Sequence, residues 1–323
     1  MQTPNSSSRR IGALLIVAAI ALLVALPMLV KGFFLFQITM VLCMALAVMG
    51  LNIVVGYGGQ LSLGHGAVFA IGAYVAAVGM DSFALHWLPA VVIAGLVCLA
   101  FGVLFGWPSL RLKGHHLALA TFALALAMPQ ILKHRSIETW TGGVQGVMVF
   151  NSPVPDWLPL SREVFVFYLV LAVVLIAFFG TAALFRSRMG RAIIAVKENQ
   201  IAAASMGVNV TRTKLATFAL SCLLTGLAGA LYTLITEYVS PDSFDLMKSI
   251  LLLVAVMVGG AGTILGPLVG AVFIQFVPNL AEQVSQSATS AIYAGFLLIM
   301  VFFMPTGVVG FVRGLLIRLR ARR

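Results

Sequence analysis

Long apolar runs separated by short polar segments make up most of the sequence. Ten of these runs are apolar enough to form membrane helices, at residues 11–30, 33–55, 61–80, 89–110, 117–132, 164–185, 215–236, 249–258, 264–277 and 288–304. The first run follows two arginines, like a signal peptide, but it has no small-residue cleavage site and is long enough to span a bilayer. The pattern therefore predicts an all-α, polytopic transmembrane helical bundle with about eight to ten spans.

The composition agrees with this pattern. Of the 323 residues, 61% are hydrophobic and 9% are charged, whereas soluble domains have roughly 25% charged residues. No segment has the composition of a separate soluble domain. We therefore expect residues 1–323 to form a single transmembrane domain.

The run at 249–258 is too short to cross a bilayer of about 30 Å alone. It and the next run are either two tight spans joined at residues 259–263 or one broken, partly re-entrant element. The charges favour two spans, because fifteen of the twenty Lys and Arg residues and only one of the nine acids, Glu198, then lie on the cytoplasmic side. Both termini are then cytoplasmic, and the net charge of +11 reflects membrane orientation rather than binding of nucleic acid.

The longest polar interruption in the second half of the chain, residues 186–214, is strongly basic. Six Lys and Arg residues lie there against Glu198 alone. Residues 198–206 are expected to form a short helix, because their three consecutive alanines favour helix and Gly207 stands where a helix ends. A basic segment between spans stays in the cytoplasm, so we interpret this one as a docking loop for another protein.

Two glycine-rich segments, residues 56–66 (GYGGQLSLGHG) and 259–267 (GGAGTILGP), interrupt the apolar pattern in opposite halves of the chain. Glycine at this density disfavours a continuous helix, and paired interruptions indicate a transport pathway with an internal repeat. Alternatively, the glycines let helices pack closely or turn the chain at the cytoplasmic surface. His65 is either a substrate- or proton-binding residue or a hydrogen-bonded structural residue. The candidate pathway residues are Gly58, Gly59, Gln60, Ser62, Gly64, His65, Gly259, Gly260 and Gly262.

Two further polar segments flank the predicted spans. The external loop 133–163 contains Trp140, Trp157, three prolines and the run TGGVQG at residues 141–146, which indicates a structured connection. Its tryptophans either anchor the loop at the membrane interface or help it to contact an external partner. The tail, residues 306–323, places Phe311 and three leucines among arginines and predicts an amphipathic helix on the anionic inner leaflet.

Several features of carriers and enzymes are missing from the sequence. No acidic or basic residue lies securely within a span, although ion-driven carriers usually place such groups at mid-membrane. There is no GxxxxGK[ST] loop for ATP and no HExxH or GxSxG motif for catalysis. The three cysteines lie in apolar runs and are expected to be packing residues. We therefore expect a membrane protein that is not an enzyme and binds no cofactor or metal itself, and whose transport depends on a motor docked at residues 186–214.

The order of several motifs resembles the permeases of branched-chain amino acid ATP-binding-cassette (ABC) transporters, and among them the LivM-type subunit. The matching segments lie between residues 51 and 271 and read, in order, GYGGQLSLGHGAVFAIGAY, HHLALATFAL, TGGVQG, MGRAIIAVKENQIAAASMGVNVTRTKLATFALS and VGGAGTILGPLVGA. Together these segments cover most of the chain. Several of them in this order indicate the family far more specifically than any single segment does.

The resemblance implies a bacterial inner-membrane subunit of an importer for leucine, isoleucine and valine that works by alternating access. Its partners would be a second permease subunit, two cytoplasmic ATPase subunits that bind ATP and Mg²⁺, and a periplasmic substrate-binding protein. The element that couples to the ATPases would comprise Gly190, Arg191, Glu198, Ala202, Ala203 and Gly207. Ala203 and Gly207 keep the spacing of importers in general, whereas Glu198 is displaced from the alanines. Docking of the binding protein would involve Thr141, Gly142, Gly143 and Gly146.

Two alternatives remain open on the sequence alone. A permease of a urea, short-amide or other amino acid importer would share this architecture, and the ligand of its binding protein would distinguish it. A stand-alone channel or secondary carrier would transport without any ATPase subunit.

Overall fold

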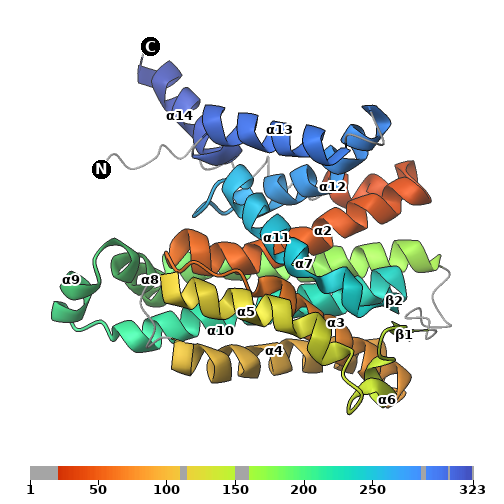
Figure 1. Ribbon diagram of the computed structural model, residues 1–323. Coiled ribbons are helices and arrows are strands. Elements are labelled where there is room, and N and C mark those ends of the chain that lie inside the picture. Colours follow the sequence, from red (N-terminus) through yellow and green to blue (C-terminus); the bar gives the residue numbers. More distant parts are fainter. Residues whose placement is uncertain (1–20, 110–114, 150–159, 285–288, 305, 322–323) are drawn as a thin grey trace.

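The computed structural model describes residues 21–109, 115–149, 160–284, 289–304 and 306–321 as a helical bundle with one short strand pair (Figure 1). This confirms the predicted all-α fold. The first predicted span is described only from residue 21, as a helix through residue 29. The other elements are α2 (Phe33–Asn52), the π-helix η1 (Ile53–Tyr57), α3 (His65–Asp81), α4 (Trp87–Ser109), α5 (His115–Leu132), α6 (Glu138–Thr141), β1 (Val147–Met148), α7 (Arg162–Arg186), α8 (Arg188–Glu198), α9 (Gln200–Ser205), α10 (Val210–Thr236), β2 (Tyr238–Val239), the 3-10 helix η2 (Pro241–Phe244), α11 (Leu246–Gly259), α12 (Gly266–Val284), α13 (Thr289–Phe303) and α14 (Gly307–Ala321).

Helix α10 forms the centre of the bundle and packs against α2, α3 and α4. Its 27 residues give it a length of about 40 Å. Small residues let its neighbours approach closely, since a Cβ on Gly229 would collide with the carbonyl oxygen of Phe69 in α3, and one on Gly226 would collide with the Cys98 side chain in α4. Such contacts are typical of membrane helix pairs. Cys43 and Cys222 are buried together with Cys98, which confirms their prediction as packing residues.

Several helices have the length and composition of membrane spans. Among the described residues, four qualify outright: Phe33–Tyr57 (α2 with η1), Trp87–Trp107 in α4, α7 and α10. Apolar helices too short to qualify lie in α3, α5 and α12. Helix α3 begins at His65 rather than at residue 61 as predicted, because Gly59 has a φ of 64° and the chain leaves the helical conformation there.

Helices α11 and α12 correspond to the two short apolar runs of the C-terminal half. They are separate helices that pack against each other, joined by a turn at residues 260–265. The 14 residues of α11 extend about 21 Å, less than the bilayer core of about 30 Å. Between α10 and α11 the chain passes through β2 and η2. The structure thus agrees with the interpretation as two elements.

The helices alternate in direction, so the connections gather at the two ends of the bundle (Figure 1). At one end lie α8, α9 and both glycine-rich segments. At the other lie α6 and the antiparallel pair of β1 and β2, in which Val147 lies opposite Val239. Helices α12, α13 and α14 form a layer on one side of the bundle. Helix α14 confirms the helix predicted for the tail, and its contact with the inner leaflet stays a prediction.

Candidate functional site

The two glycine-rich segments lie against each other, and Asn52 at the end of α2 joins them. Its side-chain nitrogen donates a hydrogen bond of 2.8 Å to the Thr263 carbonyl oxygen, and its side-chain oxygen accepts one of 2.8 Å from the Gly262 backbone nitrogen. The backbones are so close that a Cβ on Gly56 would collide with that same nitrogen. Segments that are far apart in the sequence therefore form one site. The polar Asn52 within an apolar run is a signal for this contact, because a buried amide needs partners.

The first segment begins with a local change of helix type. Helix α2 widens into the π-helix η1, a feature often found at functional sites. The backbone nitrogen of Gly58 then donates to the Ile53 oxygen at 2.9 Å, and that of Gln60 to the Val54 oxygen at 3.0 Å. The Gln60 side chain is buried, and its amide oxygen has no hydrogen-bond partner among the described residues.

A buried polar cluster closes the first segment against α10. His65 is only 1% exposed. Its Nδ1 lies 2.9 Å from the Ser62 hydroxyl, and its Nε2 forms a short hydrogen bond with the Ser221 hydroxyl in α10. The next backbone nitrogen, that of Gly66, donates to the Ser249 hydroxyl in α11 at 3.0 Å. Both ring nitrogens of His65 are thus engaged with hydroxyls, which favours the structural interpretation of this residue.

Other candidates in the first segment have packing roles. Gly64 precedes α3 and faces Thr121 of α5, so closely that a Cβ there would lie 2.9 Å from the Thr121 carbonyl oxygen. The Thr121 hydroxyl accepts a hydrogen bond of 3.0 Å from the Leu63 backbone nitrogen. Gly58 faces Thr217 of α10. These contacts fix the segment to two neighbouring helices.

The second segment is a tight turn between α11 and α12. A Cβ on Gly259 would collide with the Gly266 carbonyl oxygen, and Gly260 and Gly262 have φ values of 115° and 75°. The Thr263 hydroxyl closes the turn by donating to the Gly260 carbonyl oxygen at 2.7 Å. The glycines therefore serve the turn directly, and their role in a transport pathway stays a prediction.

The basic segment 186–214 contains two helices instead of the single one predicted. Helix α8 ends at Glu198, and α9 covers Gln200–Ser205. The prediction that Glu198 begins the short helix is wrong, because Asn199 is extended and caps α9, accepting hydrogen bonds of 3.0 Å from the Ile201 and Ala202 backbone nitrogens. Gly207 follows α9 with a φ of 83°, which confirms it as the stop.

The two helices form a hairpin, here called the coupling hairpin (residues 186–214) after the coupling role predicted for this segment from the sequence. Ile193 and Val196 on one face of α8 are buried, and Ala203 of α9 is buried as well. Gly190 allows the sharp entry into α8, since a Cβ there would collide with the Leu184 carbonyl oxygen. The hairpin is therefore an ordered part of the protein rather than a loop.

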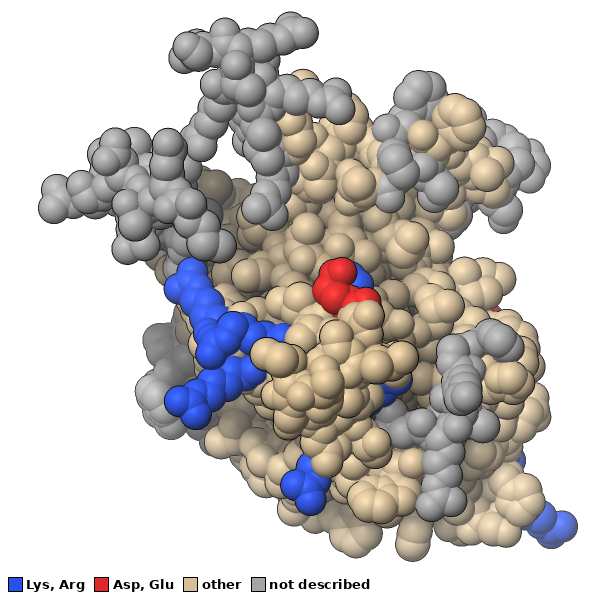
Figure 2. Space-filling view, turned by 90° about the vertical axis from the view of Figure 1, so that its left-hand side faces the viewer, with Lys and Arg blue, Asp and Glu red and all other residues tan. Residues whose placement is uncertain are grey.

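The outward side of the coupling hairpin combines positive charge with apolar side chains. Figure 2 shows this end of the molecule, where lysines and arginines outnumber acidic side chains. Ile201 is 84% exposed and Met206 is 85% exposed. Arg191, Glu198 and Ala202 are exposed as well. Neither Ile201 nor Met206 stands out in the sequence of a membrane protein, in which apolar residues are common.

At the opposite end, the run at residues 141–146 forms a turn that leads into β1. The Thr141 hydroxyl donates to the Leu132 carbonyl oxygen at 2.8 Å. Gly142, Gly143 and Gly146 have φ values of 66°, 55° and 76°, and a Cβ on Gly146 would collide with the Val239 carbonyl oxygen. These four residues are therefore required by the turn, and their predicted docking role is not tested by this geometry.

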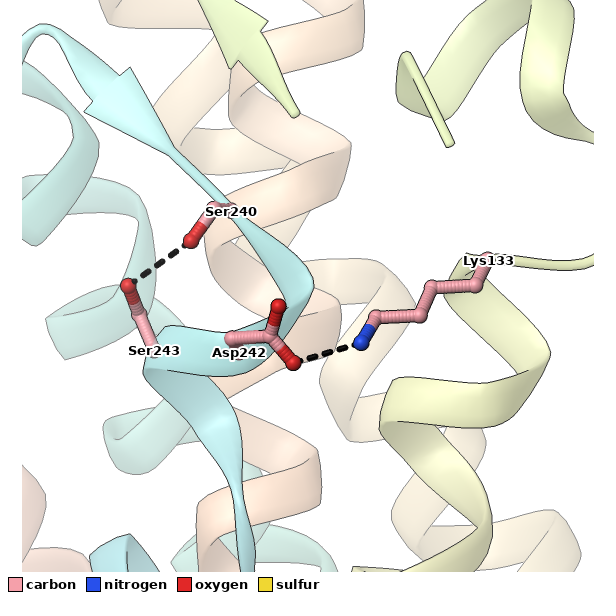
Figure 3. A network of polar contacts seen from close by, with 4 residues as sticks. All are labelled: Lys133, Ser240, Asp242 and Ser243. Atoms are coloured by element: carbon pink, nitrogen blue, oxygen red, sulfur yellow. Dashed lines mark hydrogen bonds and ion pairs between the residues drawn. The ribbon is translucent and has the colours of Figure 1, made fainter. Parts of the chain in front are cut away.

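Charged and polar contacts connect several elements at this end, which the sequence predicts to be the outer end. Lys133, at the end of α5, forms an ion pair of 2.5 Å with Asp242 of η2, beside a hydrogen bond of 3.1 Å between the Ser240 and Ser243 hydroxyls (Figure 3). Arg162, which begins α7, forms an ion pair of 2.7 Å with Glu237 at the end of α10. Trp157 of the predicted external loop lies outside the described residues.

A helical membrane bundle with two interrupted segments in contact has the architecture of a transport protein. The chain belongs to the family of permease components of branched-chain amino acid transport systems, whose model matches residues 33–304. This confirms the resemblance found in the sequence.

Named relatives agree with the family. The chain is 30% identical to the high-affinity branched-chain amino acid transport system permease protein LivM of Salmonella typhimurium and of Escherichia coli, over 93% of this chain and 75% of each relative. It is 26% identical to the corresponding protein BraD of Pseudomonas aeruginosa, over 82% of this chain and 91% of that relative. No solved structure shows a significant match.

Proposed function

We propose that the chain is the transmembrane permease subunit of an ABC importer that moves leucine, isoleucine and valine into the bacterial cytoplasm. The family and the LivM relatives support branched-chain amino acids as substrates. The observation that carries the coupling to an ATPase is the coupling hairpin, which lies at the same end of the bundle as both glycine-rich segments. The orientation of charge favours the cytoplasm for this end and for both termini.

The coupling hairpin has the surface of a docking element. Exposed Ile201 and Met206, on a segment that also carries six basic residues, form the kind of apolar contact that another protein covers. The hairpin is also ordered between its two helices, because the Asn199 side chain caps the first turn of α9. Closure of two ATPase subunits on ATP would then move the hairpin as one piece.

Transport would proceed by alternating access in a complex with a second permease subunit. The helices that begin after each glycine-rich segment, α3 and α12, would tilt to open the pathway to one side or the other. A periplasmic binding protein would deliver substrate to the outer end, where Trp140, just before the turn at residues 141–146, and Val144, within it, are exposed. The chain itself would supply no energy, since ATP and Mg²⁺ bind the partner ATPases.

The proposal is tested by purifying the chain from its native membrane in mild detergent and identifying what accompanies it by mass spectrometry. We expect an ATPase pair and a second permease subunit. Ile201→Asp combined with Met206→Asp should release the ATPases, whereas Val144→Asp, a matched change at the outer end, should not. A wild-type chain that purifies alone and transports without an ATPase would be a channel or carrier. A urea- or amide-binding partner protein would change the substrate assigned.

A further inference from the structure

Lys197 lies in the last turn of α8 and reaches from the coupling hairpin to the first glycine-rich segment. Its ammonium donates a hydrogen bond of 2.7 Å to the Gly56 carbonyl oxygen in η1. The stem of the side chain crosses Gly59, where a Cβ would lie 2.9 Å from the Lys197 Cγ. Gly59 thus leaves room for the lysine to lie flat on the segment.

The hydrogen bond from Lys197 to Gly56 lies where it can influence both glycine-rich segments. Carbonyl groups in the last turn of a helix have no helical partner, and a bond from a charged donor is stronger than one from a neutral donor. Gly56 is also the residue whose backbone touches Gly262, and Asn52 bridges to Gly262 and Thr263. A displacement of Lys197 therefore acts at the point where both glycine-rich segments meet.

Lys197 is exposed, as are most basic residues of the hairpin, and it differs from them in its partner. Arg191 and Lys214 bond within the hairpin, to the Arg186 carbonyl oxygen and the Gln200 side chain, whereas Lys197 bonds to Gly56 outside it. Lys197 is separated from the first residue of α9 only by Glu198 and Asn199. A force applied to α9 consequently reaches Lys197 over a very short length of chain.

We propose that Lys197 is a positioning residue that transmits movement of the coupling hairpin to both glycine-rich segments. This inference rests on the proposed docking of the hairpin to an ATPase. Lys197 need not touch substrate or ATPase to fulfil this role. Its loss should leave ATPase binding and hydrolysis intact while less substrate moves for each ATP consumed.

The first test measures ATP hydrolysed per leucine transported by the complete transporter in proteoliposomes. Lys197→Met should raise this ratio about fivefold or more, the lower range of coupling between linked sites. Lys197→Arg should restore most of the coupling, because it keeps a charged donor. Lys214→Met is the matched control and should leave the ratio unchanged.

A second test replaces the hydrogen bond by a covalent bond. The Cβ built on Gly59 would lie 3.6 Å from the Lys197 Cβ, within the range of about 3.5–4.5 Å for disulfides, and the three native cysteines are buried. The variant Gly59→Cys with Lys197→Cys should be uncoupled when reduced and recover coupling when oxidised. Gly59→Cys alone shows the effect of replacing the glycine.

The outcomes separate the inference from the proposed function. A normal ratio in Lys197→Met would overturn the role of Lys197 while leaving the importer assignment intact. An oxidised double-cysteine variant as uncoupled as the reduced one would also overturn it, because a rigid link would then be insufficient. Absence of ATPases from the purified wild-type complex would refute the proposed function and, with it, this inference.

Discussion

Replacement of Asn52 by leucine should destabilise the protein at the junction of the two glycine-rich segments. Asn52 is 2% exposed and forms one hydrogen bond to each of Gly262 and Thr263. Leucine has a similar size, so it leaves no large cavity, but it leaves a backbone donor and a backbone acceptor unpaired. Each unpaired buried group costs about 1–3 kcal/mol. We expect a total loss of about 2–4 kcal/mol, because water at this end of the bundle can satisfy part of the deficit.

The free energy of unfolding can be measured by titrating the purified protein with sodium dodecyl sulfate in mixed micelles and following tryptophan fluorescence. Asn52→Asp keeps the acceptor for the Gly262 nitrogen but replaces the donor to the Thr263 oxygen by a second oxygen, and an ionised carboxylate would be buried there, so at neutral pH it should lose at least as much as Asn52→Leu. Asn209→Ala is a control that removes the cap of α10, whose side chain accepts from the Arg212 nitrogen at 2.9 Å, and it should cost about 1 kcal/mol. A loss below about 0.5 kcal/mol for Asn52→Leu, the usual range of surface substitutions, would refute the bridging role.

Two further changes test the ends of the bundle. Gly207→Trp should leave the protein in the membrane but abolish transport, because no described atom lies within 4 Å of a Cβ there and the indole would project from the proposed docking surface. Gly207→Asn, which tolerates a φ of 83° with little bulk, should retain transport in an uptake assay. Lys133→Met should reduce the free energy of unfolding by only about 0–1 kcal/mol, because the Asp242 side chain of the pair is 68% exposed. A much larger loss in the same titration would show that the stability of this end of the bundle depends on the ion pair.

The hydrophobic pattern predicts the spans well, because a single apolar segment in lipid can pair its backbone groups only by forming a helix. A run such as residues 33–55 has no charged side chain, and before Asn52 its amide and hydroxyl side chains are those of Gln37 and Thr39. A break in the helix would leave backbone groups unpaired in lipid, and the run forms α2 and η1. Helix α8 is harder to predict, because its basic residues conceal a buried stripe formed by Ile193 and Val196, three positions apart. In the sequence, Asn199 is the residue that marks the boundary between α8 and α9. Its side chain caps α9, so Glu198 ends one helix and the alanines belong to the next.

The candidate site is predicted only in part, because its contacts join distant parts of the chain. Glycine density locates both interrupted segments, but the bond from Asn52 to Thr263 spans 211 positions. The bond from Lys197 to Gly56 spans 141 positions. Neither pairing follows from spacing or composition. The packing of α2, α8 and the turn before α12 determines both.

The same packing makes one obvious test of the second segment uninformative. Gly259→Leu combined with Gly260→Leu would impair transport in any case, because a Cβ on Gly259 collides with the backbone of α12 and Gly260 has a φ of 115°. The loss would report a disrupted turn and not a blocked pathway. The second segment is therefore better tested through a side chain that bonds to it, that of Asn52.

For His65, an experiment can distinguish a structural role from a role in the transport pathway. Both its ring nitrogens face hydroxyls, those of Ser62 and Ser221, and a neutral imidazole satisfies both. A protonated ring would place an uncompensated charge in the bundle interior. We therefore expect His65 to stay neutral throughout transport and to act by holding α3 against α10.

The change His65→Gln tests this expectation, because glutamine keeps a donor and an acceptor but cannot carry charge. We expect a loss of about 1–3 kcal/mol in unfolding free energy from imperfect hydrogen bonds. Uptake of leucine per folded molecule should stay within about twofold of wild type, with an unchanged profile between about pH 5.5 and 8, where histidine ordinarily titrates. If uptake is lost while stability is retained, or if the pH profile shifts, His65 belongs to the pathway and its two hydroxyl contacts must open during transport.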